Sequence, residues 1–302
     1  MGLLPVEDDR GAGKLFRGDG VRAQGWYRAW PEGSFTVVTC DFTMLLDTLF
    51  AVDTPRYLTV RSPMSSSADH GAAAGPAAIA YIETREERVT TPVPAGSHFA
   101  YAEVEYFEDA LRGAFADLEW NSIGALSALL ADMRGGVGWI PGILPALDGI
   151  ARVDPTAPGA ALIYEGAAKT LLGALVGTVA AALPKERRDR AGILAAIELA
   201  HARWREGASQ AEAAAAAGMG PTKFKRLFRQ ATGRSWGVYL AAQRMREAQR
   251  LLAGGMRVAE AAHAVGYRSP TSFSATFAKW CGMTPSDYRE ATVLAVRQVG
   301  GI

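Results

Sequence analysis

Cysteine is scarce in this chain of 302 residues, which contains only Cys40 and Cys281. Two cysteines cannot supply the disulfide framework of a small secreted domain or a cysteine-rich zinc site. The first residues, MGLLPVEDDR, also lack the basic stretch and long apolar run of a secretory signal. The longest uncharged apolar stretch, residues 170–183, is shorter than the roughly 20 residues that span a bilayer. These absences predict a protein of a reducing compartment, without a membrane-spanning helix.

Patterns typical of enzymes are lacking as well. The sequence contains no GxSxG, HExxH, Walker or Rossmann motif, and its four histidines are scattered. Cys40 stands alone, whereas alkyl-transfer repair needs a reactive cysteine that is usually accompanied by cysteines holding zinc. The acidic pair Glu103 and Glu105 is interpreted as part of a solvated strand. We therefore expect no enzyme activity, no metal site and no cofactor.

Charge is divided unevenly along the chain. Residues 1–184 carry 13 Lys and Arg against 22 Asp and Glu, whereas residues 185–302 carry 19 against 9. A basic part joined to an acidic one indicates contact with a nucleic acid or an acidic membrane at one end. Because 49% of the residues are hydrophobic, each part can bury a core of its own. We predict two domains, 1–184 and 185–302.

The first part changes from a strand pattern to a helical one. Mixed β-branched, aromatic and polar residues predict strands between about residues 21 and 108, among them 34–42, 56–60, 77–87 and 98–107. Clusters of Pro, Gly and Ser predict loops at 62–76 and 91–96. Helical periodicity then predicts helices at 108–133 and 160–183, the second ending at Pro184.

The basic part contains two predicted helix-turn-helix segments, and the first covers residues 209–231. Ser209 can cap a helix, Gly218 can end it, and Pro221 suits the first turn of the next helix. The spacing i, i+3, i+4, i+7 predicts one buried stripe on this second helix: Phe224, Leu227, Phe228 and Ala231. The remaining face is basic.

The second segment, residues 257–281, repeats this arrangement with Gly266 at the turn and Pro270 early in its second helix. Its predicted buried stripe is Phe273, Phe277 and Trp280. Residues 236–252 between the segments form a continuous helical pattern of roughly 25 Å. Adjacent major-groove faces of a duplex recur about every 34 Å. A rigid connecting helix could therefore place two recognition helices in successive major grooves.

Residues 190–290 resemble the DNA-binding domain of AraC/XylS-type transcriptional regulators. The matching stretches include LFRQATG at 227–233, VAEAAHAVGY at 258–267, SFSATF at 272–277 and GMTPSDYR at 282–289. The resemblance implies a bacterial, cytoplasmic, sequence-specific transcription regulator with an all-α C-terminal domain and a variable N-terminal sensing domain. The strands and aromatics of the N-terminal part fit a cupin-like β-sandwich followed by helices. The expected fold class is therefore α+β with more than one domain.

The resemblance also suggests roles on the first recognition helix. In this family, bases are read from the positions of Thr222, Lys225 and Arg226, and Lys or Arg can donate to the O6 and N7 acceptors of guanine. Lys223 and Arg229 are expected to contact phosphates. Solvated surface charge is the alternative for each of them.

On the second recognition helix the corresponding positions are Thr271, Ser272, Ser274 and Ala275. The family often has a basic residue where this chain has Ala275, which weakens the expectation of direct base reading there. The hydroxyls of Thr271, Ser272 and Ser274 remain candidates to contact bases, and Arg268 and Lys279 are expected on phosphates. The first helix is expected to supply most of the sequence discrimination.

The expected partners are double-stranded promoter or operator DNA and a small-molecule effector, with no membrane. Trp26, Tyr27, Trp30, Phe35 and Tyr57 are candidates to line an effector pocket, with core packing as the alternative. A homodimer and contact with RNA polymerase stay open, and the stripe Ile193, Ile197, Ala200 and Trp204 fits either a dimer interface or internal packing. The competing class is a ligand-independent architectural DNA-binding protein whose N-terminal domain binds a protein partner.

Overall fold

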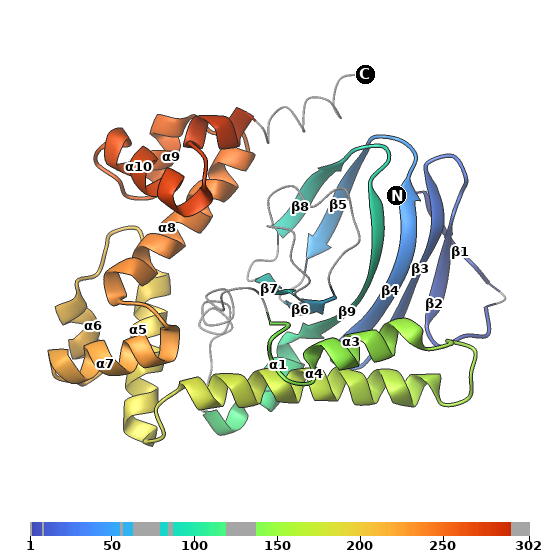
Figure 1. Ribbon diagram of the computed structural model, residues 1–302, viewed down its shortest axis with the longest axis horizontal. Helices are drawn as coiled ribbons and strands as arrows, with labels where there is room; N and C mark the ends of the chain where they lie inside the picture. The colour runs from blue at the N-terminus through green and yellow to red at the C-terminus, as the bar shows by residue number, and fades with distance from the viewer. Residues whose placement is uncertain are drawn as a thin grey trace. The chain divides into compact units, whose positions relative to one another are not determined.

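The computed structural model describes residues 2–7, 9–54, 57–62, 79–83, 87–118 and 137–290. The chain divides into two compact units, Met1–Ala181 and Ala182–Ile302. The first unit is built on antiparallel sheet with helices, and the described part of the second is helical (Figure 1). The expected α+β fold with two domains is therefore confirmed.

Seven strands of the N-terminal unit form one antiparallel sheet in the order β1-β2-β3-β4-β9-β6-β7. In that order their bounds are Leu3–Pro5, Lys14–Gly18, Ala23–Glu32, Phe35–Met44, His98–Phe107, Tyr57–Arg61 and Ile79–Glu83. A second sheet pairs β5 (Thr48–Thr54) with β8 (Glu87–Val93). The strand pattern predicts β9 at its observed bounds, whereas β1 and β2 lie before the region where strands are predicted.

The large sheet presents different faces to the helices and to the second sheet. Successive residues of a strand point to opposite faces, so Tyr106 and its neighbour Glu105 face apart. The Tyr106 hydroxyl donates a hydrogen bond of 2.6 Å to the carbonyl of Ala168 in helix α4 (Ala160–Ala182). On the opposite face Cys40 and Phe42 belong to a buried cluster with Val93 of β8. One face therefore packs on helices and the other faces the space between the sheets.

The helices of this unit follow β9. Helix α1 (Glu108–Ala114) and the 3-10 turn η1 (Ala116–Leu118) are described, and the rest of the predicted helix 108–133 lies outside the described residues. Helix α3 (Ile143–Arg152) and α4 run along the sheet (Figure 1). Within the described residues, α4 is the helix whose length and hydropathy would suffice to cross a membrane. Its Leu171, Leu175 and Val179 are fully buried, at the spacing of a helix that packs one face on a sheet.

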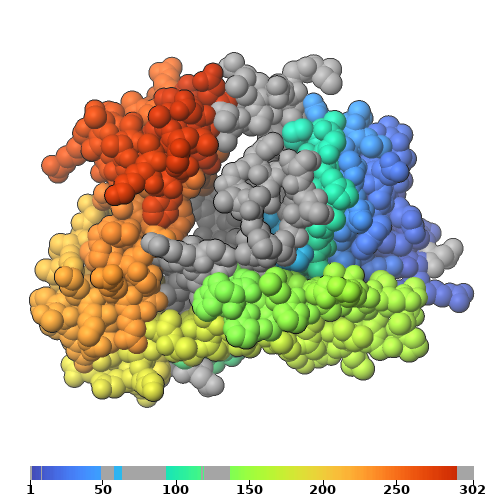
Figure 2. Space-filling view, viewed as in Figure 1, coloured from blue at the N-terminus to red at the C-terminus, as the bar shows by residue number. Residues whose placement is uncertain are grey.

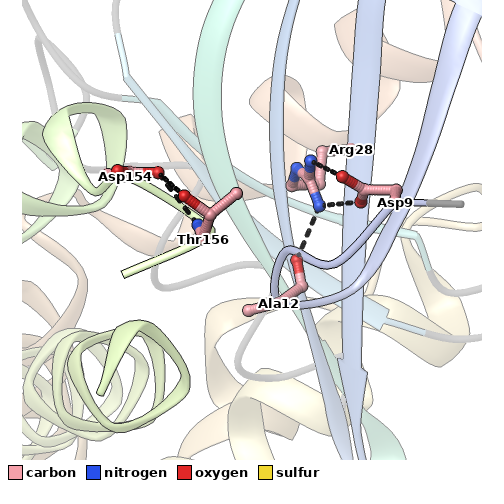
Figure 3. A network of polar contacts seen from close by, with 5 residues as sticks. All are labelled: Asp9, Ala12, Arg28, Asp154 and Thr156. Atoms are coloured by element: carbon pink, nitrogen blue, oxygen red, sulfur yellow. Dashed lines mark hydrogen bonds and ion pairs between the residues drawn. The ribbon is translucent and has the colours of Figure 1, made fainter. Parts of the chain in front are cut away.

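Arg28 of β3 ties the segment between β1 and β2 to the sheet (Figure 3). Its guanidinium donates to both Asp9 carboxylate oxygens at 2.5 and 2.9 Å and to the Ala12 carbonyl at 3.1 Å. The Ala12 N–H donates in turn to the carbonyl of Pro155, in the loop between α3 and α4, at 2.7 Å. Hydrogen bonding from Arg28 lowers the pKa of Asp9.

The described helices of the C-terminal unit are α5 (Arg187–Arg203), α6 (Gln210–Ala216), α7 (Pro221–Thr232), α8 (Trp236–Ala253), α9 (Val258–Ala264) and α10 (Pro270–Cys281). Helices α6 and α7 pack near one end of α8, and α9 and α10 at the other (Figure 1). In the space-filling view these helices form a continuous yellow-to-red mass of side chains (Figure 2). The helices lie where the periodicity predicts them.

The stripe on α5 is internal. Ile193, Ile197 and Ala200 are fully buried, and α5 contacts both α6 and α7. Gly192 of the same helix sits so close to α6 that an added Cβ would lie 2.3 Å from the Ala217 carbonyl oxygen. Of the two alternatives for this stripe, the structure selects internal packing over a dimer interface.

Candidate DNA-binding surface

The first helix-turn-helix is built by local signals that the sequence displays. The Ser209 hydroxyl accepts from the Glu212 N–H at 3.2 Å, and the Glu212 carboxylate accepts from the Ser209 N–H at 2.7 Å, which forms a capping box at the start of α6. Gly218 follows α6 with φ +63, and Pro221 opens α7. The expected buried stripe of α7 is observed, with Phe224 and Phe228 in ring contact with Trp236 of α8.

The opposite face of α7 is exposed and basic. Every expected DNA-contacting residue of this helix is exposed: Thr222, Lys223, Lys225, Arg226 and Arg229. Lys223 forms an ion pair of 2.7 Å with Asp189 of α5, whose side chain is 11% exposed. Within the described part of the chain, Lys225, Arg226 and Arg229 form no ion pair, so their charges face solvent.

The face of α10 is polar but carries little charge. Thr271, Ser272, Arg268 and Lys279 are exposed, and Ser274 is partly buried. The Ser272 hydroxyl donates to the Ser269 carbonyl at 3.0 Å, which leaves its oxygen able to accept from a ligand. Phe273 and Phe277 are fully buried as expected.

Trp280 corrects the predicted core stripe of α10. It is 37% exposed, and the guanidinium of Arg234 lies 5.0 Å from its ring centroid. Helical spacing assigns Trp280 to the stripe, but the residue lies near the end of the helix, where the core beneath it stops. A cation–π contact takes the place of core packing there.

Helix α8 and the loop after α5 join the two helix-turn-helix segments. Arg244 of α8 donates to the carbonyls of Trp204 and Arg205 at 2.8 and 3.1 Å, and its guanidinium lies 5.8 Å from the ring centroid of Tyr267. A Cβ on Gly266 would meet the Arg205 carbonyl oxygen at 2.3 Å. The loop therefore fits tightly between α8 and the turn of the second segment, and this contact fixes how the two segments are oriented.

The N-terminal candidates for an effector pocket do not share one environment. Trp30 packs against Tyr164 of α4 and against Phe35, on the helix side of the sheet. Tyr27 lies on the opposite face, against the buried cluster of Cys40 and Phe42. Trp26 is partly buried and, as the neighbour of Tyr27 on the strand, points to the opposite face of the sheet. Tyr57 pairs with Phe107 in the sheet, and its side chain lies outside the described residues. The structure does not bring these five residues together.

Glu103 is a second residue that the sequence interpretation places wrongly. It is 6% exposed, whereas the pattern predicts a solvated strand. Burial raises its pKa to about 8, and repulsion from Glu105 adds to the shift. The only available signal was the alternation of β9, which places Glu103 and Glu105 on the face opposite Val104 and Tyr106.

The described residues show neither an ionised Cys40 thiol nor a metal-binding cluster. Burial raises the pKa of the Cys40 thiol to about 12, so this thiol is not ionised at neutral pH. No group of three or more His, Cys, Asp or Glu that could hold a metal occurs in the part of the chain that the structure describes.

The profile of a helix-turn-helix domain family matches residues 213–291. The transcriptional activator RhaR of Yersinia pseudotuberculosis is 43% identical over 67 residues, which are 22% of this chain and 23% of that protein. The helix-turn-helix part of the chain is therefore similar to the DNA-binding domain of such transcriptional activators. The match spans about a quarter of the curated relatives' length, and the domain profile covers no part of the N-terminal unit.

Two solved structures align with the chain at low TM-scores, one over a third of its length and one over most of it. The DNA-binding domain of AdpA in complex with a target DNA is 33% identical, covering 33% of this chain and 91% of that one, with a TM-score of 0.32. ToxT from Vibrio cholerae O395, bound to a naphthalenyl butenoic acid, is 11% identical, covering 86% of this chain and all of that one (100%), with a TM-score of 0.37.

Proposed function

We propose that this protein is a cytoplasmic transcription regulator that binds promoter or operator DNA through two recognition helices, α7 and α10. The observation that carries the proposal is the exposed basic face of α7, mounted at one end of α8 with a second helix-turn-helix at the other. The 18 residues of α8 span about 27 Å, close to the separation of successive major grooves.

The residues of α7 divide into two proposed roles. Thr222, Lys225 and Arg226 read base edges, and Arg229 contacts phosphate. Lys223 also contacts phosphate, and its ion pair with Asp189 supports a second role, because it ties the recognition helix to α5. The ion pair with Asp189 restricts the position of the Lys223 ammonium group.

The residues of α10 are proposed to contribute less to sequence discrimination. Thr271, Ser272 and Ser274 offer hydroxyls, and Arg268 and Lys279 grip the backbone. Lys279 is the one cation within α10, whereas α7 contains four. The N-terminal unit is proposed to bind a small-molecule effector that alters DNA affinity.

Selection of bound duplexes from a random library, using the full chain, tests the DNA-binding function. The expected result is a nonpalindromic motif of roughly 20 base pairs with two conserved blocks about one helical turn apart. Binding without enrichment, which simply collapses as salt rises, would contradict sequence-specific regulation and favour the architectural alternative.

A further inference from the structure

A group of polar side chains lies on the inter-sheet face of β6 and β9. Thr59 and Arg61 of β6 stand opposite Glu105 and Glu103 of β9 in the antiparallel register. Residues two apart on a strand share a face, so Tyr101 belongs to the same group. The Arg61 guanidinium lies 5.1 Å from the Tyr101 ring centroid. Two adjacent strands thus bring these five side chains onto one face.

Two oxygen atoms of this group are buried without a hydrogen-bond partner. Thr59 is fully buried and Glu103 is 6% exposed. Neither the Thr59 hydroxyl oxygen nor the Glu103 Oε2 has a partner in the structure. Burying a polar atom without a hydrogen-bond partner costs folding free energy. Two such oxygen atoms on neighbouring strands of one face therefore indicate a place where a ligand supplies the missing hydrogen-bond donors.

The charges around Glu103 indicate what that ligand brings. The titratable or charged groups described on this face besides Glu103 itself are Arg61 on β6, Tyr101 and Glu105 on β9, Cys40 on β4, Tyr27 on β3 and the exposed Lys14 on β2. Two carboxyl groups thus face one guanidinium. A positive charge between the carboxyl groups would remove their repulsion and pair the unpartnered oxygen.

We propose that the face around Glu103, Glu105 and Thr59 binds a small organic cation, such as an amine or an amidine, as the effector. This inference rests on the proposed function, in which the N-terminal unit senses a small molecule. Glu103 pairs with the cation, and the Thr59 hydroxyl accepts from a second N–H of the same group.

Binding of a cation is coupled to the proton on Glu103. Because the pKa of Glu103 is about 8, the empty site holds a neutral carboxylic acid at pH 6, and the cation must displace its proton. Affinity is therefore expected to rise about tenfold per pH unit up to pH 8 and then to level off. A neutral effector would show no such rise.

Calorimetric titration of the full chain at pH 6 and pH 9 tests this inference with matched probes. The cations are benzamidine and cyclohexylamine, and the neutral counterparts are benzamide and cyclohexanol. We expect both cations to bind about a hundredfold more tightly at pH 9 than at pH 6, and the neutral probes to bind weakly at both. Equal binding of cation and neutral counterpart, or no cation binding at pH 9, would overturn the proposal.

Three variants separate the site from general effects. Glu103→Gln resembles the protonated acid in shape and should fold, but lose the cation preference and its pH dependence. Thr59→Val should weaken cation binding at both pH values, and Glu32→Gln, at the exposed end of β3, should change nothing. Retention of the pH dependence in Glu103→Gln would contradict the inference. Binding of duplex DNA is measured with the same variants. We expect DNA binding to stay intact when the cation site is lost, so failure of the cation proposal can be told apart from failure of the proposed DNA-binding function.

Discussion

Lys223 and Arg226 lie three residues apart on α7 but have different surroundings. The ammonium of Lys223 pairs with the mostly buried Asp189, whereas the exposed Arg226 has no ion-pair partner among the described residues. A guanidinium without an intramolecular partner keeps its whole fork of donors for guanine O6 and N7. The surroundings thus favour Arg226 over Lys223 as the residue that reads sequence.

Substitution of Arg226 by Ala is expected to relax base preference at one position of the selected motif. Loss of a bidentate contact should cost about 1–3 kcal/mol of discrimination there and leave the other positions unchanged. Duplex selection with the variant measures this. Arg229→Ala is the matched control, for which uniform weakening across sequences is expected; the same uniform weakening in Arg226→Ala would reassign that residue to phosphate.

His201 makes the stability of the C-terminal unit dependent on pH. Its Nε2 lies 3.5 Å from the Tyr239 hydroxyl and 3.4 Å from the Gln243 Nε2, and burial lowers its pKa to about 4. The unfolded chain therefore binds a proton more readily than the folded one between pH 6.5 and 4, so stability falls as pH drops through that window.

We expect His201 to cost about 2 kcal/mol of folding free energy on going from pH 7 to pH 5. Urea unfolding of the full chain and of His201→Asn at both pH values measures this contribution. It is the difference between the pH dependences of the two proteins, because the other titrating groups are the same in both. The exposed His263→Asn serves as control. An unchanged pH dependence in His201→Asn would show that His201 is not buried in its neutral form.

At the scale of elements, Gly266 and Gly282 form a matched pair. Both have positive φ, +83 and +77, but a Cβ on Gly266 would lie 2.3 Å from a backbone oxygen, whereas nothing lies within 4 Å of one on Gly282. Gly282→Ala should cost about 1–2 kcal/mol for the left-handed conformation alone.

Gly266→Ala should cost more than about 3 kcal/mol, because the turn of the second segment must also move away from the loop after α5. Chemical denaturation of both variants measures the difference. We also expect Gly266→Ala to weaken binding to the block of the motif that α10 contacts. Equal stability loss in the two variants would mean that the contact with Arg205 yields without cost.

The sequence predicts the helical elements better than the sheet. Capping residues, turn glycines and a 3.6-residue period define α6, α7 and α10 without reference to anything distant. Strands β1 and β2 are stabilised instead by pairing with β3, and nothing within their own few residues signals it. Glu103 is misread for the same reason, since its burial depends on the sheet and not on its neighbours in sequence. Which face of a sheet is covered is a tertiary property.

At the scale of the whole molecule, the length of α8 and the contacts of Arg244 and Gly266 hold the two helix-turn-helix segments at one separation. Inserting five base pairs between the two blocks of the selected motif rotates one block by about half a turn of the duplex. We expect this insertion to reduce affinity to that of a single block. Electrophoretic mobility shifts with spacers of zero, five and ten base pairs measure it, and tolerance of the five-base-pair spacer would mean that the two segments move independently.

The loop after α5, which is held between Arg244 and Gly266, affects how the proposed regulator would respond to the twist of the DNA. Two readers that cannot rotate about α8 require the duplex to present its grooves at a set angle. Overwinding or underwinding changes the angle between those grooves, and the duplex, not the protein, must then absorb the torsion. For the proposed regulator, occupancy of its binding site should therefore follow local supercoiling, and a stiff junction in the protein would make that occupancy depend on the twist of the chromosome.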